Sequence, residues 1–215
     1  MATGKDGIWG PSVVAALGQA VLAYDPPTAQ HCDRVAEITS LVAAELDLDE
    51  RERKAAQLSG VVHDIGKLSI PTAILNKAAP LSIEEKDKLE GHSLVGAELL
   101  LSVGPQFRHI ADGVRSHHER WDGKGYPDGL SGNEIPLLGR MLAVVDVFDA
   151  MTNIRSYRKT VYQFDAAREY LMVNSGSQFD PDCVAAALAV LEKKSRKRSR
   201  GSPKTGSEPR DDLVE

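Results

Sequence analysis

The sequence predicts an all-α protein with one domain. Apolar residues recur at helical spacing along most of the 215 residues, and no pair of strands with hairpin-turn residues stands out. Leu137–Met151 is nearly all apolar and is expected to form a buried helix, although Leu137–Val147 taken alone could be mistaken for a strand. A chain of this length can bury a sizeable core.

The helices can be placed from their apolar stripes and end signals. Pro11 lies near the start of the first, the second begins near His31, and the third is capped by Asp49 and stops at Gly66. Ser82 and Glu85 form a possible capping box for a helix that reaches about residue 101. Further helices are expected at about 106–118, 137–151, 165–173 and 181–194.

The composition changes abruptly at Lys193. The stretch KKSRKRSRGSPKTGSEPRDDLVE is rich in charge, Ser, Gly and Pro, and is predicted to be a disordered tail at 193–215. Its basic part has a second interpretation, as a contact for nucleic acid or an anionic membrane. The rest divides into an N-terminal helical extension at 1–27 and a catalytic domain at 28–192.

Composition excludes several classes of protein. The net charge is −5, so nucleic acid is an unlikely partner, and no apolar run approaches the roughly 20 residues of a membrane span. The N-terminus lacks the features of a signal peptide. The isolated Cys32 and Cys183 fit a reduced, cytoplasmic protein better than a disulfide framework.

Two apolar helices carry acids that require a partner. Asp64 follows His63 in VVHDIGK, while Asp146 and Asp149 share a face of MLAVVDVFDAM. Burying an unpaired carboxylate costs several kcal/mol, and a metal cation removes that cost. Asp64 has two oxygens and could bridge two ions. Of Asp146 and Asp149, one could be a ligand and the other a structural acceptor or cap. Nitrogen and oxygen ligands without thiolate point to iron or manganese.

Four motifs in this order resemble the HD-GYP domain, a branch of the HD phosphohydrolase superfamily: HDIGK, HHERWDGKGYP, VVDVFDAMT and SGSQFDP. The resemblance covers roughly 28–191. It implies a helical bundle with a metal cluster in its core and hydrolysis of the bacterial second messenger cyclic di-GMP to linear pGpG, with GMP as a further product. The implied metal ligands are His31, His63, Asp64 as the bridge, His92, His117, His118 and Asp146.

The resemblance also implies substrate-binding residues. Lys67 would lie beside the scissile phosphate as a catalytic residue, although a lysine after a helix end is commonly just solvated. Arg155 and Arg158 in RSYRKT would hold phosphate, which suits the planar fork of arginine. In the glycine-rich loop, Tyr126 is expected at the lip of the site, while Trp121 fits a lip or the core equally well.

Three functions remain open from the sequence. The first is a cyclic di-GMP phosphodiesterase; the second is a hydrolase of another cyclic dinucleotide. The third is a low-activity receptor that acts on diguanylate cyclases through the GYP loop, the glycine-rich loop that contains Gly125, Tyr126 and Pro127. Some family members hold a third metal with a glutamate four positions before the first histidine. That position is Pro27 here, and the nearby Asp25 is interpreted as structural, so we expect two divalent ions.

Overall fold

The computed structural model describes residues 11–153 and 162–201, and within these ranges it contains helices, turns and no strand. The predicted all-α class is confirmed. The described part has ten α-helices: α1 (Pro11–Tyr24), α2 (Pro26–Glu45), α3 (Glu50–Val62), α4 (Thr72–Leu75), α5 (Ile83–Glu90), α6 (His92–Val103), α7 (Arg108–Arg115), α8 (Leu137–Thr152), α9 (Phe164–Val173) and α10 (Pro181–Gly201). Three short 3₁₀ helices lie between them: η1 (Ile65–Ser69), η2 (Pro105–Phe107) and η3 (Gly132–Glu134).

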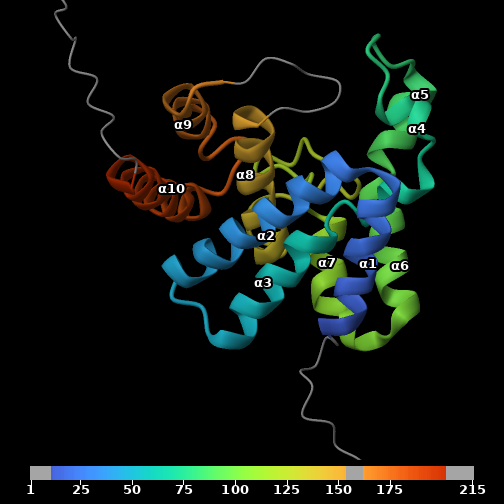
Figure 1. The fold of residues 1–215 in the computed structure, drawn as a ribbon, viewed down its shortest axis with the longest axis horizontal. Coiled ribbons are helices and arrows are strands. Elements are labelled where there is room, and N and C mark those ends of the chain that lie inside the picture. The colour runs from blue at the N-terminus through green and yellow to red at the C-terminus, as the bar shows by residue number, and fades with distance from the viewer. Residues whose placement is uncertain (1–10, 154–161, 202–215) are drawn as a thin grey trace, which may run out of the picture.

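Helix α2 is the centre of the bundle (Figure 1). It contacts α1 and α3 along one flank and α8 and α10 along the other. Helices α6 and α7 lie against each other, and α7 also contacts α3 and α8. The core fills the space between these helices and includes the fully buried side chains of Val35, Val62, Ile110 and Met141. None of the described helices is both long and apolar enough to cross a membrane.

Several helix ends follow the predicted signals. The backbone N–H of Glu52 donates to Asp49, which caps α3, and Ser82 with Glu85 forms the expected capping box of α5. Helix α2 begins earlier than predicted, at Pro26. Prolines in the first turn cost no hydrogen bond there, because those N–H groups have no intrahelical partner.

The predicted helix at 82–101 is two helices. Gly91 both ends α5 and precedes α6, so that His92 opens a new helix. The predicted helix at 106–118 is also shorter, because α7 ends at Arg115 and the paired histidines lie beyond it. Helix α10 continues past Lys193 to Gly201, so the first residues of the expected tail have a helical backbone; residues 202–215 lie outside the described part.

One glycine decides how close η1 lies to α6. A Cβ on Gly66 would fall 1.9 Å from the carbonyl oxygen of His92 and 2.7 Å from the backbone nitrogen of Gly96. Only a residue without a side chain allows this approach. The contact brings the turn after α3, which carries Asp64, against the start of α6, which carries His92.

Candidate metal centre

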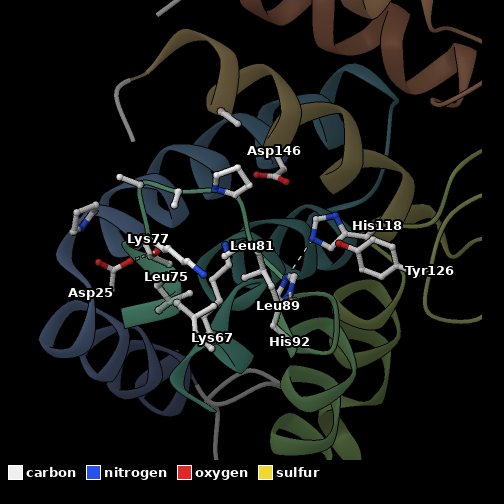
Figure 2. Close-up of a pocket in the computed structure, with 17 residues that line it drawn as sticks. Asp25, Lys67, Leu75, Lys77, Leu81, Leu89, His92, His118, Tyr126 and Asp146 are labelled. Atoms are coloured by element: carbon white, nitrogen blue, oxygen red, sulfur yellow. Dashed lines mark hydrogen bonds between the residues drawn. The ribbon is translucent and has the colours of Figure 1, made fainter. Parts of the chain in front are cut away.

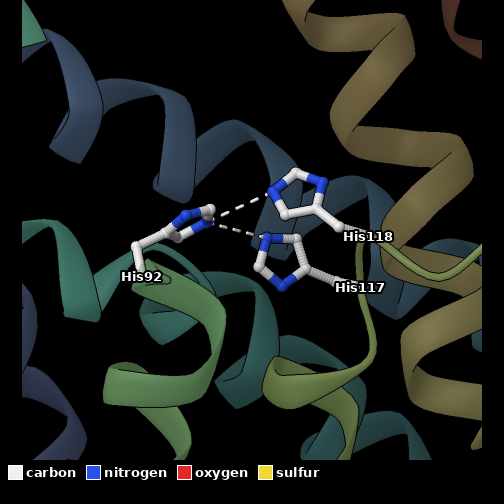
Figure 3. Close-up of side chains that lie close together, drawn as sticks. All are labelled: His92, His117 and His118. Atoms are coloured by element: carbon white, nitrogen blue, oxygen red, sulfur yellow. Dashed lines mark hydrogen bonds between the residues drawn. The ribbon is translucent and has the colours of Figure 1, made fainter. Parts of the chain in front are cut away.

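The side chains expected to bind metal lie together where α2, α8 and the ends of α3, α6 and α7 meet. Four of the histidines and Asp64 are buried, whereas His118 and Asp146 keep partial exposure. Their atoms form two groups, in each of which the potential ligand atoms lie within 4.8 Å of one another: His31, His63 and Asp64; and His92, His117 and His118 (Figure 3).

Asp64 connects the two groups. Its Oδ2 lies 3.6 Å from Nε2 of His63, while its Oδ1 lies 3.3 Å from Nε2 of His92. One oxygen therefore faces each group, as a bridging carboxylate requires. Asp146 adjoins the first group, since its Oδ1 lies 2.9 Å from Nε2 of His31 and 4.0 Å from Nε2 of His63.

Within each group, inner nitrogens of the histidines face one another. In three of these residues the outer nitrogen, Nδ1, donates to the backbone carbonyl three positions earlier: His63, His92 and His117. A carbonyl only accepts, so the proton is on Nδ1 and the inner Nε2 presents a lone pair.

These lone pairs converge at short range. The Nε2 atoms of His31 and His63 are 3.2 Å apart, and Nε2 of His92 lies 3.2 Å from that of His118 and 3.3 Å from that of His117. Lone pairs at this distance repel, whereas a cation between them binds both. The residues therefore fit divalent metal ions, and the imidazoles of His63, His92 and His117 are each fixed by the hydrogen bond that the outer nitrogen donates.

Burial favours the neutral form of three of the imidazoles. Desolvation lowers the pKa of His63, and it lowers the pKa of His117 well below its usual value. Burial, together with the neighbouring His92, lowers the pKa of His118 to about 3. Neutral imidazole is the form that binds metal, so these histidines need lose no proton to do so at pH 7.

Asp64 is ionised despite its burial. Burial acts to raise its pKa, but the ammonium of Lys67 and the nearby His63 and His92 outweigh this and hold the pKa well below the usual value. The Nζ of Lys67 donates to Oδ2 of Asp64 at 2.6 Å. Lys67 is thus held at the centre rather than solvated away from it.

Of the two acids in α8, Asp146 faces the cluster and Asp149 fixes the imidazole of His31. Asp149 is buried and accepts a 2.6 Å hydrogen bond from Nδ1 of His31. It also accepts two from the guanidinium of Arg34, at 2.7 and 2.9 Å. Sequence reasoning missed Arg34, although its position three residues after His31 places it on the same face of α2.

A cavity of about 520 Å³ opens beside the centre (Figure 2). The residues of the cluster that line it are His92, His118 and Asp146, joined by Lys67 and Tyr126. This volume lies in the range of small-molecule sites. The cavity thus leads from the surface to His92, His118 and Asp146 of the cluster.

Comparison with known proteins identifies the family. A family model for the HD domain matches residues 17–183. The chain belongs to the HD domain family. The motif-based resemblance is confirmed, and the cluster of histidines and aspartates lies in the core of the helical bundle, where the metal site was expected.

Two named phosphodiesterases are similar in sequence to this chain. It is 41% identical over 175 residues to the cyclic di-GMP phosphodiesterase response regulator RpfG of Xanthomonas campestris pv. campestris, covering 80% of this chain and 46% of that one. It is 36% identical over 179 residues to 3′3′-cGAMP-specific phosphodiesterase 3 of Vibrio cholerae, covering 83% and 38%. The chain therefore spans less than half the length of these relatives.

A solved structure shares the HD domain fold. The crystal structure of a cyclic GMP-AMP specific phosphodiesterase of Vibrio cholerae superimposes with a TM-score of 0.65 and 20% identity, covering 89% of this chain and 50% of that one. At this identity the likeness supports the fold alone.

The GYP loop of this HD domain presents one aromatic ring to the site. Tyr126 lines the cavity and stacks on His118, with ring centroids 4.9 Å apart and planes at 30°. Trp121 is not among the lining residues. Its ring lies 5.8 Å from the guanidinium carbon of Arg140, and its backbone N–H donates to the backbone carbonyl of Gln178, so this residue joins the loop to the segment before α10.

Glu119 anchors the same loop and was missed from sequence. It is buried, and its Oε1 accepts from the backbone N–H groups of Asp128 and Gly129. Gly125 packs closely against the backbone that follows His118. A Cβ on Gly125 would fall 2.4 Å from the backbone nitrogen of Arg120. The sequence signal that could have identified Glu119 is its position directly after the paired histidines.

Arg155 and Arg158 lie outside the described residues. His109 lies apart from the cluster, on the surface, where it pairs with Glu52 at 2.8 Å. Cys32 is buried, and burial raises the pKa of its thiol well above the usual value, which agrees with a structural role.

Proposed function

We propose that this chain is a metal-dependent phosphodiesterase that hydrolyses cyclic di-GMP to linear pGpG, with further cleavage to GMP as a slower step. The observation that carries the proposal is Asp64, whose oxygens face two groups of histidine lone pairs beside an open cavity. The 41% identity to a relative named as a cyclic di-GMP phosphodiesterase supports the choice of substrate.

The proposed cofactor is a pair of divalent ions, iron or manganese. One would be held by His31, His63 and Asp146, the other by His92, His117 and His118, with Asp64 shared. Imidazole and carboxylate ligands without thiolate favour these metals. When bound, two such ions would activate water and offset charge on the phosphate.

The chain's own side chains would bind and orient the substrate. Lys67 lines the cavity with its ammonium beside Asp64, where it can donate to an oxygen of the scissile phosphate. Arg155 and Arg158 are proposed, from their motif alone, to hold phosphate. Tyr126, backed by His118, offers a flat face on which a guanine can stack.

Two further proposals concern the setting of the enzyme. The GYP loop would be the surface that contacts diguanylate cyclases, because Glu119 and Gly125 give its backbone a fixed shape. A second messenger acts inside the cell, so we place the activity in the cytoplasm.

The test is metal analysis of anaerobically purified protein, followed by chromatography of the products. We expect conversion of cyclic di-GMP to pGpG. Cyclic GMP-AMP should be assayed in parallel, because one relative is named as specific for it. Faster turnover of cyclic GMP-AMP would move the assignment to that substrate. Tight binding of cyclic di-GMP without turnover by metal-loaded protein would favour the receptor.

A further inference from the structure

The cavity has a second cationic side chain, apart from the metal centre. Among the described residues that line it, the lysines are Lys67 and Lys77. Lys67 is held at the metal end by its 2.6 Å contact with Asp64. Lys77 follows α4, and Figure 2 shows it on the side of the cavity away from His118 and Tyr126.

Lys77 pairs with Glu85 and can leave this partner for a ligand. Its Nζ donates to Oε2 of Glu85 at 2.6 Å, and its side chain keeps 33% exposure. The same carboxylate oxygen accepts from the backbone nitrogen of Ser82 at 2.8 Å as part of the capping box of α5. Glu85 therefore keeps a hydrogen-bond partner when Lys77 turns toward a ligand, and an ion pair that is still partly exposed to water contributes little stability.

The proposed substrate has a matching feature. A cyclic dinucleotide carries two phosphodiesters on opposite sides of its ring, each with one negative charge. When one lies at the metal centre, the other stays charged and extends into the cavity. A volume of about 520 Å³ accommodates much more than a single phosphate. A phosphate that loses its water of hydration in the cavity requires a positively charged group that is hydrogen-bonded to it.

We propose that Lys77 binds the second, uncleaved phosphate of the cyclic dinucleotide and leaves Glu85 to do so. This rests on the proposed function and adds a substrate-binding residue to that site. The wall that carries Lys77 supports it, because Ile74, Leu75 and Leu81 also line the cavity and give the bases an apolar surface beside the phosphate. Lys77 would thus favour diesters with two phosphates over those with one.

The experiment compares two substrates in one protein. Cyclic di-GMP has both phosphates, whereas bis(p-nitrophenyl) phosphate has only the one that is cleaved. We expect Lys77→Gln to reduce kcat/KM for cyclic di-GMP by at least about tenfold more than for the single-phosphate diester, mainly through KM. The ratio of the two values within one preparation is independent of how much of that protein is folded.

The matched control is Lys86→Gln. Lys86 lies on α5 beside Glu85, is exposed, pairs with Glu90 at 3.4 Å and does not line the cavity. We expect its substrate ratio to equal that of the wild type. If the Lys77 variant also kept the wild-type ratio while the wild type hydrolysed cyclic di-GMP, the role of Lys77 would be overturned and the proposed function would stand. A wild type that cleaved only the single-phosphate diester would overturn both.

Discussion

His31 and Asp149 form a 2.6 Å hydrogen bond between α2 and α8, from Nδ1 of the imidazole to Oδ2 of the carboxylate. This bond turns Nε2 of His31 toward His63 and Asp146. Burial acts to raise the pKa of Asp149, but the hydrogen bonds from His31 and Arg34 outweigh it and lower the pKa. An ionised carboxylate behind a ligating imidazole makes that imidazole more basic toward metal.

The first prediction is that Asp149→Asn weakens metal binding at the His31 group more than at the His92 group. The amide keeps the size of the side chain but loses the charge that holds His31 and Arg34. Loss of such a partner costs about 10–100-fold in metal affinity. After dialysis against a chelator, metal content should fall from about two to about one ion per chain.

Asp33→Asn is the matched control, because Asp33 is an exposed acid on α2 beside Arg34. It should keep the wild-type metal content. An Asp149→Asn protein that retained both ions under the same dialysis would show that the carboxylate only supports the fold.

The second prediction concerns the shared carboxylate. Asp64→Ala should lose both metals and all activity while the helical circular dichroism spectrum survives, because both histidine groups lose a ligand at once. Asp87→Ala, at an exposed position on α5, serves as the control. Full metal occupancy in Asp64→Ala would contradict the bridging role.

Much of the candidate site could be predicted from the sequence, because its residues conflict with their local pattern. Asp64 and Asp146 are acids in apolar stretches, and this conflict indicated a cation. Arg34 and Lys77 show no such conflict. A basic residue on a helix or a turn is common in any protein. The role of Arg34 or of Lys77 depends on which distant segment lies against its side chain, and the local sequence does not show this.

The fold shows the same division. Apolar spacing and capping residues predicted most of the helices and several of their ends, whereas the four-residue α4 was not predicted. The break at Gly91 was missed, since a single glycine at the junction of two helical patterns is also tolerated within a helix. The approach of Gly66 to His92 depends on how η1 docks on α6, and local pattern carries no information on docking.

The third prediction follows from that approach. Gly66→Ala would place a Cβ 1.9 Å from the carbonyl oxygen of His92, so η1 must move away from α6 and take Asp64 with it. Overpacking of this kind costs about 1–3 kcal/mol, which lowers Tm by several degrees in a chain of this size. Metal affinity should fall as well, and calorimetry with metal analysis measures both.

Gly18→Ala provides the comparison. A Cβ on Gly18 would meet only a side-chain methyl of Val61, at 3.2 Å, and alanine favours the interior of α1. Its Tm should be equal to or above that of the wild type. If both variants kept the wild-type Tm and metal content, the tight approach at Gly66 would have no energetic role.

The fourth prediction separates the ring of Tyr126 from its hydroxyl. The ring stacks on His118 and lines the cavity. Stacking of a base on an aromatic ring is worth about 1–3 kcal/mol, so Tyr126→Ala should raise KM for cyclic di-GMP at least fivefold or so. Tyr126→Phe keeps the ring and should stay near the wild-type KM. Equal losses in the two variants would assign the contribution to the hydroxyl.

The last prediction is the number of metals. The converging side chains form two groups of potential ligand atoms, and Asp64 connects the two groups. Pro27 lines the cavity at the position where some HD-GYP proteins carry a metal-binding glutamate, and it has no ligand atom. Asp25 also lines the cavity, but its Oδ2 accepts from the hydroxyl of Thr28 at 2.5 Å. We therefore expect two ions per chain.

Pro27→Glu tests this count directly. Pro26 still supplies the start of α2, and an acid is favourable in the first turn of a helix, so the variant should fold. Its carboxylate would lie on the cavity wall, and anaerobic metal content should rise from about two toward three. Asp25→Asn is the control and should leave the wild-type count at two. A wild type with three ions, one of which is lost in Asp25→Asn, would show that Asp25 is a ligand and that the centre is trinuclear.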